Sequence, residues 1–216
     1  MEDWNKDINE WTNEKELINV KKDCNDSGLE NIETEKYKNQ VEKTYQIIKQ
    51  IEDIGMPKSN EQLKLITFKT FNSVLFLKHI AEKEKINNII IVVYSINHEA
   101  AKIINDMIIN KTIKNATILI SNLRNKAHRV KEQLTRDLFV NNPNIDLFFC
   151  QSHAKIISME TENGNYYTIE GSGNLSFNSR IEQYSIENSK DYYLFNKNWI
   201  LKIKDFLKNK KELILT

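Results

Sequence analysis

From residue 62 onward the chain alternates between short apolar runs and amphipathic segments, and this alternation limits the folds open to it. The clearest apolar run covers residues 89–94 (Ile-Ile-Ile-Val-Val-Tyr), which is too short to cross a bilayer and is typical of a buried strand. A strand that is apolar on both faces needs helices above and below the sheet to cover it. The pattern therefore predicts an α/β domain built in layers.

The limits of the expected elements follow from apolar spacing and from the turn residues between the segments. Residues 142–144 (Asn-Pro-Asn) interrupt the pattern, and residues 162–165 (Glu-Asn-Gly-Asn) predict a hairpin turn. The expected strands cover residues 63–67, 89–94, 116–121, 145–157, 166–170 and 180–187. The expected helices cover residues 72–85, 98–110, 125–140 and 197–209.

The first 57 residues differ from the rest in the spacing of their apolar residues. Val41, Tyr45, Ile48 and Ile51 recur at helical spacing, which predicts an amphipathic helix over residues 32–54 that ends before Gly55 and Pro57. We expect residues 1–57 to form a helical N-terminal appendage and residues 58–216 to form the main domain.

The charge is distributed unevenly along the chain, although the net charge of the 216 residues is only +1. Residues 1–62 contain 15 Asp/Glu and 9 Lys/Arg, a balance of −6, which leaves a balance of +7 for residues 63–216. The basic part suits a polyanionic partner. A solvated surface without a partner would give the same balance.

The cysteines and the first residues of the chain bear on its location. Cys24 and Cys150 form no disulfide or metal-ligand pattern, and the acidic start of the chain lacks the basic-then-apolar order of a signal peptide. No apolar run is long enough for a transmembrane helix. We therefore expect a reducing, cytoplasmic location and no association with a membrane.

His153 and Lys155 are the first candidate site residues. Side chains alternate between the faces of a strand, so two residues spaced two apart point the same way. Burying this pair without partners would cost several kcal/mol, so we expect their face to be solvated, paired or functional. An ordinary edge strand with two polar side chains is the alternative.

A second candidate feature follows the next expected strand, at Gly171-Ser172-Gly173-Asn174. The two glycines allow a ligand to approach the backbone closely, and Ser172, Asn174 and the loop amides could donate hydrogen bonds to phosphate oxygens. An ordinary turn has similar composition. Downstream, Glu182 could orient a histidine or form a surface ion pair.

Together these residues resemble the phospholipase D superfamily, whose signature is His-x-Lys, then an Asp, then Gly-Ser-x-Asn. The matching stretch, about residues 145–190, is most similar to compact bacterial and phage members that carry one motif per chain. The resemblance implies a phospholipase D-like layered fold, with a mixed sheet flanked by helices. The chain departs from the family pattern in having Glu160 in the Asp position and a longer gap before Gly171.

In this family a histidine attacks phosphorus and forms a phosphohistidine intermediate, which water then resolves. The resemblance gives the nucleophile's role to His153 and assigns Lys155 and Asn174 to charge stabilisation. It places Ser172, Glu160 and Glu182 in the catalytic set, and Gly171, Gly173 and Arg180 among the substrate-binding residues. It implies no metal and no cofactor.

The reaction needs two histidines, and the chain has one such motif. His79, His98 and His128 lack a lysine two residues later, and ordinary roles are expected for them. The resemblance therefore implies a homodimer in which two copies of His153 face each other across a two-fold axis.

The substrate class is less constrained. Lys126 and Arg129 lie on one face of a basic expected helix, which suits nucleic acid but is also compatible with a solvated helix. We expect a metal-independent nuclease that acts on DNA, with RNA as the alternative substrate. The alternative is a catalytically silent nucleic-acid-binding module of a phage or mobile element. A membrane phospholipase is the third option.

Overall fold

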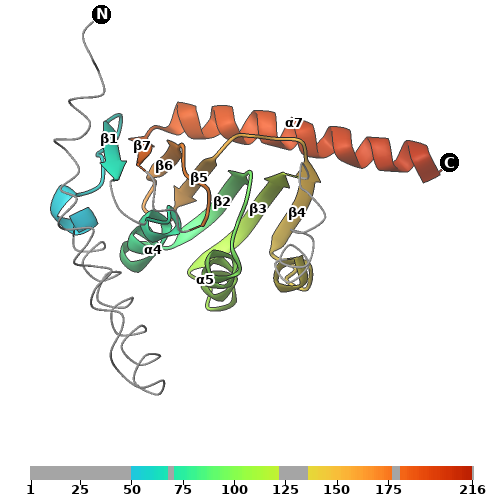
Figure 1. The fold of residues 1–216 in the computed structure, drawn as a ribbon, viewed down its shortest axis with the longest axis horizontal. Coiled ribbons are helices and arrows are strands. Elements are labelled where there is room, and N and C mark those ends of the chain that lie inside the picture. The colour runs from blue at the N-terminus through green and yellow to red at the C-terminus, as the bar shows by residue number, and fades with distance from the viewer. Residues whose placement is uncertain (1–49, 68–70, 122–135, 177–180, 216) are drawn as a thin grey trace, which may run out of the picture. The chain divides into compact units, whose positions relative to one another are not determined.

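The computed structural model describes residues 50–67, 71–121, 136–176 and 181–215, which lie within one compact unit, Ile48–Thr216 (Figure 1). The strands are β1 (Gln62–Thr67), β2 (Ile86–Val93), β3 (Ile113–Ser121), β4 (Ile145–Cys150), β5 (Ile156–Thr161), β6 (Tyr166–Gly171) and β7 (Glu182–Asn188). The named helices are α4 (Val74–Lys83), α5 (His98–Ile109) and α7 (Lys190–Leu215).

The seven strands form one mixed sheet in the order β1-β7-β6-β5-β2-β3-β4. Strands β2, β3 and β4 run parallel to one another, as expected where helices connect them, whereas β5, β6, β7 and β1 pair antiparallel. The predicted α/β class and mixed sheet are confirmed. Both candidate motifs adjoin the antiparallel half of the sheet, one before β5 and the other at the end of β6.

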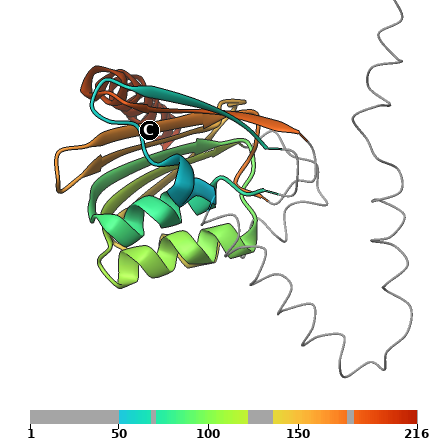
Figure 2. The same cartoon turned by 90° about the vertical axis from the view of Figure 1, so that its left-hand side faces the viewer.

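Helices cover both faces of the sheet, with α4 and α5 on one side and α7 on the other (Figure 2). The inner strand β2 is apolar on both faces, and Ile89 to Val93 are all buried. On the α7 side Ile90 and Val92 pack in one cluster with Tyr193 and Ile200 of the helix. Burial on both faces explains why the sequence of this strand is a continuous apolar run.

The expected strand over residues 145–157 is wrong. Strand β4 ends at Cys150 on one edge of the sheet, and β5 begins at Ile156 between β2 and β6, so residues 151–155 cross from the edge to the middle. The connection runs along one end of the sheet (Figure 1). The periodicity could not reveal this break, because apolar residues flank it on both sides.

Most other expected elements are confirmed with small shifts at their ends, but the last helix is longer than expected. Helix α7 begins at Lys190 rather than residue 197, because its aromatic first turns are apolar on the side that faces the sheet. Of the expected helix 125–140, residues 136–140 are helical and the others lie outside the described residues.

The described end of the N-terminal segment is helical over residues 50–54. The helix ends at Gly55, whose φ of 77° is readily adopted only by glycine, as the sequence predicts. The rest of the predicted helix 32–54 lies outside the described residues, and a domain boundary after residue 57 stays a prediction. None of the described helices combines the length and apolar composition needed to span a bilayer.

Candidate active site

His153 and Lys155 lie in the crossing segment just before β5. Lys155 Nζ lies 3.3 Å from Nδ1 of His153 and donates a hydrogen bond to the His153 backbone oxygen at 2.9 Å. The Ser152 hydroxyl accepts a hydrogen bond from the backbone N–H of Ala154 (3.2 Å), which stabilises the turn between them. The side chains lie together as predicted, although the connecting segment and not a strand positions them.

The ring of His153 is exposed on one side and contacts Tyr94 on the other, with 5.1 Å between ring centroids. Tyr94 directly follows β2, so the imidazole lies at the carboxyl end of that strand. Burial lowers the pKa of Lys155, and the nearby Glu182 carboxylate acts in the opposite direction. A half-buried ammonium beside an exposed imidazole can attract a phosphate group to the histidine.

The Gly-Ser-Gly-Asn loop begins where β6 ends and is fixed to β7. The backbone N–H of Ser172 donates to the Gln183 carbonyl (3.0 Å), and the Gln183 N–H donates to the Ser172 hydroxyl oxygen (3.1 Å). The Ser172 hydroxyl in turn donates to the buried carboxylate of Glu182. Ser172 and Glu182 therefore hold this loop against the start of β7.

The two glycines allow the loop to approach Tyr184 closely. A Cβ atom at Gly171 would lie 2.5 Å from Tyr184 Cδ1, and one at Gly173 would overlap the Tyr184 hydroxyl and lie 3.0 Å from Cζ. Neither glycine has a positive φ, so close packing is the reason for glycine here. The Tyr184 hydroxyl is buried and has no hydrogen-bond partner among the described residues.

Asn174 links the loop to the segment that follows β2. Its side-chain oxygen accepts a hydrogen bond from the Ser95 backbone N–H (3.1 Å), and the next residue, Leu175, forms a parallel bridge with Ile96. Because the side-chain oxygen is engaged, the amide orientation is fixed and its NH₂ group is the end that can donate to a ligand.

A cleft of about 480 Å³ lies beside His153 and Lys155. Residues from the crossing segment, the end of β6 and the start of β7 line it: His153, Ala154, Lys155, Ile156, Glu170, Gly171, Ser172, Gln183, Tyr184 and Ser185. Sequence reasoning missed Glu170, Gln183, Tyr184 and Ser185, because only the pairing of β5, β6 and β7 brings them to the motif.

The structure does not bring Glu160 to this cleft. Glu160 lies five residues beyond Lys155 in β5, which is about 16 Å along an extended strand. Its carboxylate accepts hydrogen bonds from Asn88 Nδ2 (3.0 Å) and from the Tyr193 hydroxyl (3.4 Å), so it joins β2, β5 and α7. Glu160 therefore forms a contact between the sheet and α7, outside the cleft lining, and its place among the catalytic residues stays a prediction.

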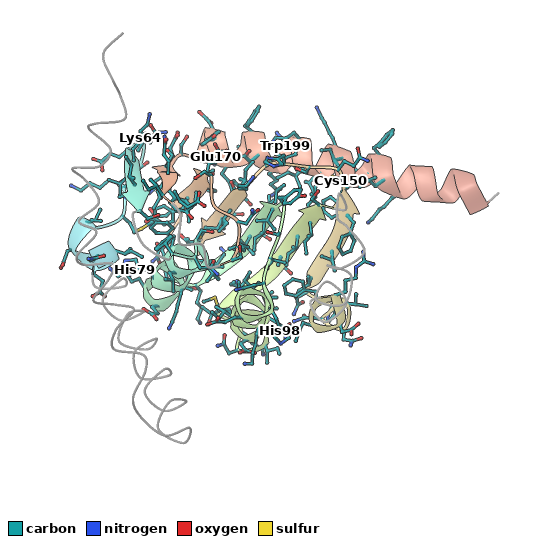
Figure 3. All side chains as sticks on the ribbon, in the orientation of Figure 1. Lys64, His79, His98, Cys150, Glu170 and Trp199 are labelled. Carbon is teal, nitrogen blue, oxygen red and sulfur yellow. The ribbon has the colours of Figure 1, made fainter. Side chains whose placement is uncertain are left out.

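Several other expected residues do not contribute to the described site. Lys126, Arg129, Arg180 and His128 lie outside the described residues. His79 and His98 lie on α4 and α5, on the face of the sheet opposite α7 (Figure 3). Within the described ranges, no group of three or more His, Cys, Asp or Glu side chains is arranged to hold a metal ion.

No protein-family model and no curated protein matches the chain. Polyphosphate kinase from Porphyromonas gingivalis matches in structure with a TM-score of 0.51 and 10% identity, over 66% of this chain and 26% of that chain. Nuc, a phospholipase D family member from Salmonella typhimurium, has a TM-score of 0.46 and 16% identity, over 64% of this chain and 92% of that chain. The yeast tyrosyl-DNA phosphodiesterase has a TM-score of 0.34 and 16% identity, over 57% of this chain and 32% of that chain.

The match to polyphosphate kinase, with a TM-score of 0.51, bears on the fold. Polyphosphate kinase is a member of the phospholipase D superfamily, and its match covers 66% of this chain. The chain therefore has a phospholipase D-like fold, as its two motifs predict. It spans about a quarter of the polyphosphate kinase chain, and at these identities the likeness concerns the fold alone.

Proposed function

We propose that the protein is a metal-independent phosphodiesterase that hydrolyses DNA through a phosphohistidine intermediate. The observation that carries the proposal is the pairing of Lys155 Nζ with His153 Nδ1, 3.3 Å apart, beside a cleft that the Gly-Ser-Gly-Asn loop also lines. A nucleophile, a cation and a set of hydrogen-bond donors thus surround one place where a phosphodiester can bind.

In the first step a neutral ring nitrogen of His153 uses its lone pair to attack phosphorus. The P–N bond forms as the bond from phosphorus to the leaving oxygen breaks, and the leaving oxygen takes a proton from an imidazolium on the other side. Lys155, drawn from its contact with Nδ1 by the phosphate, stabilises the charge on the non-bridging oxygens together with the NH₂ group of Asn174.

The second step regenerates the enzyme. The imidazole that lost its proton now removes one from water, whose oxygen attacks phosphorus as the P–N bond breaks and its electrons return to His153. The proposal assigns this acid–base role to His153 of a second copy in a homodimer with two-fold symmetry. Among the described histidines, His79 and His98 lie on the other face of the sheet and do not line the cleft. His128, outside the described residues, lacks the lysine two residues later that marks the motif.

DNA is the substrate we propose, with a cytoplasmic site of action. Residues 63–216 carry a balance of +7, which favours a polyanion over a zwitterionic lipid. The cleft wall supplied by β6 and β7 contains hydroxyl, amide and carboxylate groups, which suit the polar groups of a nucleotide better than an acyl chain.

The test is cleavage of end-labelled single-stranded DNA in EDTA by the wild type and by His153→Ala. His98→Ala is the matched control, because His98 is an exposed histidine on α5 away from the cleft. We expect cleavage by the wild type and the control, and a loss of about a thousandfold or more in His153→Ala. Loss of all cleavage in EDTA, or full activity of His153→Ala, would overturn the proposal.

A further inference from the structure

The cleft beside His153 contains polar groups for which the hydrolytic steps have no use. Glu170, Gln183 and Ser185 line its wall on β6 and β7, whereas His153 and Lys155 line it from the crossing segment. A phosphodiester held at His153 has a nucleoside on each side of the phosphate. The wall on β6 and β7 therefore faces one of these two nucleosides.

The wall is built on paired strands and is therefore rigid. Ile156, Glu170 and Ser185 are direct partners across β5, β6 and β7, so their side chains share the face that α7 covers elsewhere. Gln183 lies two residues before Ser185 on the same face, and both its backbone groups bond to Ser172. Figure 3 shows Glu170 in this part of the sheet, near the start of α7.

Glu170 is an unexpected residue beside a phosphate site, because an ionised carboxylate repels the phosphate and can only accept hydrogen bonds. The Tyr192 hydroxyl of α7 lies close enough to Glu170 to donate a hydrogen bond to its carboxylate. Burial, this hydrogen bond and the carboxylate charges of Glu170 and Glu187 raise the pKa of Tyr192, so the phenol keeps its proton and remains a donor. A group that binds Glu170 must therefore present hydrogen-bond donors, and the N–H edge of a nucleobase does so.

We propose that this wall is a nucleobase subsite that selects guanine next to the scissile phosphate. The two oxygens of Glu170 accept the parallel N1–H and N2–H donors of guanine, and the Gln183 amide donates to O6. Ile156 supplies an apolar floor, and about 480 Å³ is enough for a nucleoside. The inference rests on the proposed function only in placing the phosphate at His153.

Binding tests the inference independently of cleavage. Fluorescently labelled single-stranded DNA pentamers of sequence TTXTT, with phosphorothioate linkages, are titrated with the full chain and followed by anisotropy. The central base X is guanine, inosine, adenine, cytosine or thymine. We expect guanine to bind about tenfold more tightly than adenine or thymine, as expected for a bidentate base contact. Inosine, which lacks the N2 amino group, should lie between them.

Two variants separate base reading from charge. Glu170→Gln and Glu187→Gln each remove one negative charge, and Glu187 lies on β7 outside the cleft lining, bonded to Gln62. The loss of one negative charge should by itself change the affinity for all five pentamers by a similar factor in both variants. We expect Glu170→Gln to abolish the guanine preference and Glu187→Gln to retain it.

Equal dissociation constants for all five pentamers would overturn the inference, as would no binding or a guanine preference that survives Glu170→Gln. If Glu170→Gln weakens only self-association, Glu170 contacts a second copy and not a base, and the inference also fails. A guanine preference without any cleavage in EDTA would support the subsite and contradict the proposed hydrolysis. Cleavage without base preference would support the hydrolysis and contradict the subsite.

Discussion

The hydroxyl of Tyr184 lies directly beneath Gly173, in the space that a Cβ atom at position 173 would occupy. The tyrosine comes from β7, and the glycine belongs to the loop that carries Ser172 and Asn174. Tyr184 is buried against Phe71 and Phe76, with 5.4 and 5.5 Å between ring centroids, so the aromatic cluster supports the loop from below. The position of Asn174 therefore depends on core packing.

Gly173→Ala should displace this loop. The added methyl group overlaps a fixed hydroxyl, and we expect a loss of about 1–3 kcal/mol in the free energy of unfolding, with lower activity. Tyr184→Phe alone should change stability little, because the hydroxyl that it removes has no partner among the described residues. In the double variant the loss from Gly173→Ala should be partly restored. Urea unfolding of all four proteins measures the coupling, and additive losses would contradict this contact.

Asn174→Asp separates the two roles of this side chain. Aspartate keeps an oxygen to accept the Ser95 N–H but replaces the NH₂ donor with a second acceptor. We expect a melting temperature close to that of the wild type and a loss of about a hundredfold or more in kcat/KM. A large loss of stability with little loss of turnover would show that Asn174 serves the fold and not the phosphate.

The shared site predicts how mixtures behave. When wild-type protein exchanges subunits with an equal amount of His153→Ala, half of the wild-type chains are drawn into mixed dimers that contain one histidine. DNA cleavage should therefore fall to about half of its initial rate, although the wild-type amount is unchanged. An equal amount of His98→Ala should not reduce the rate. Unchanged cleavage in the first mixture would indicate that each chain works alone.

His79 predicts a dependence of stability on pH. It is fully buried in α4, neither ring nitrogen has a partner among the described residues, and burial and Lys83 lower its pKa, against the opposing charges of Glu52 and Glu82. As the pH falls through the ordinary histidine value of about 6.5, the unfolded chain takes up this proton before the folded one. The free energy of unfolding should therefore fall below that pH.

The comparison is between the wild type, His79→Leu and His98→Ala. His79→Leu keeps the position apolar, so its free energy of unfolding should decrease less between about pH 7 and about pH 5 than that of the wild type. The exposed His98 serves as the control, and its variant should follow the wild type. Parallel curves for all three proteins would show that His79 titrates alike in the folded and unfolded states.

The fold could be predicted from the sequence where one physical signal dominates. Ile89 to Val93 are buried on both faces, which requires covering helices, and the Gly55 and Asn163-Gly164 turns lie where expected. The crossing at residues 151–155 could not be found, because which strand pairs with which is decided by contacts far apart in the sequence. The contacts of Glu160 could not be predicted for the same reason, since its partners Asn88 and Tyr193 come from other elements.

The candidate site could be predicted in its motifs but not in its supports. His153, Lys155 and the glycine loop are visible as residue types at fixed spacing. Tyr184 and Glu170 are ordinary strand residues in the sequence. They gain their roles from the registers Gly171–Tyr184 and Glu170–Ser185, which local patterns do not determine. Only the two glycines hint that a bulky side chain lies against the loop.

The central claim is that His153 forms a covalent bond to phosphorus. Internally labelled DNA is mixed with the wild type, His153→Ala and His98→Ala, quenched in alkali and separated under denaturing conditions. We predict a protein–DNA adduct in the wild type and in His98→Ala that survives alkali, is released by acid, as a P–N bond requires, and maps to the peptide containing His153. No adduct in the wild type, or an equal adduct in His153→Ala, would contradict the account.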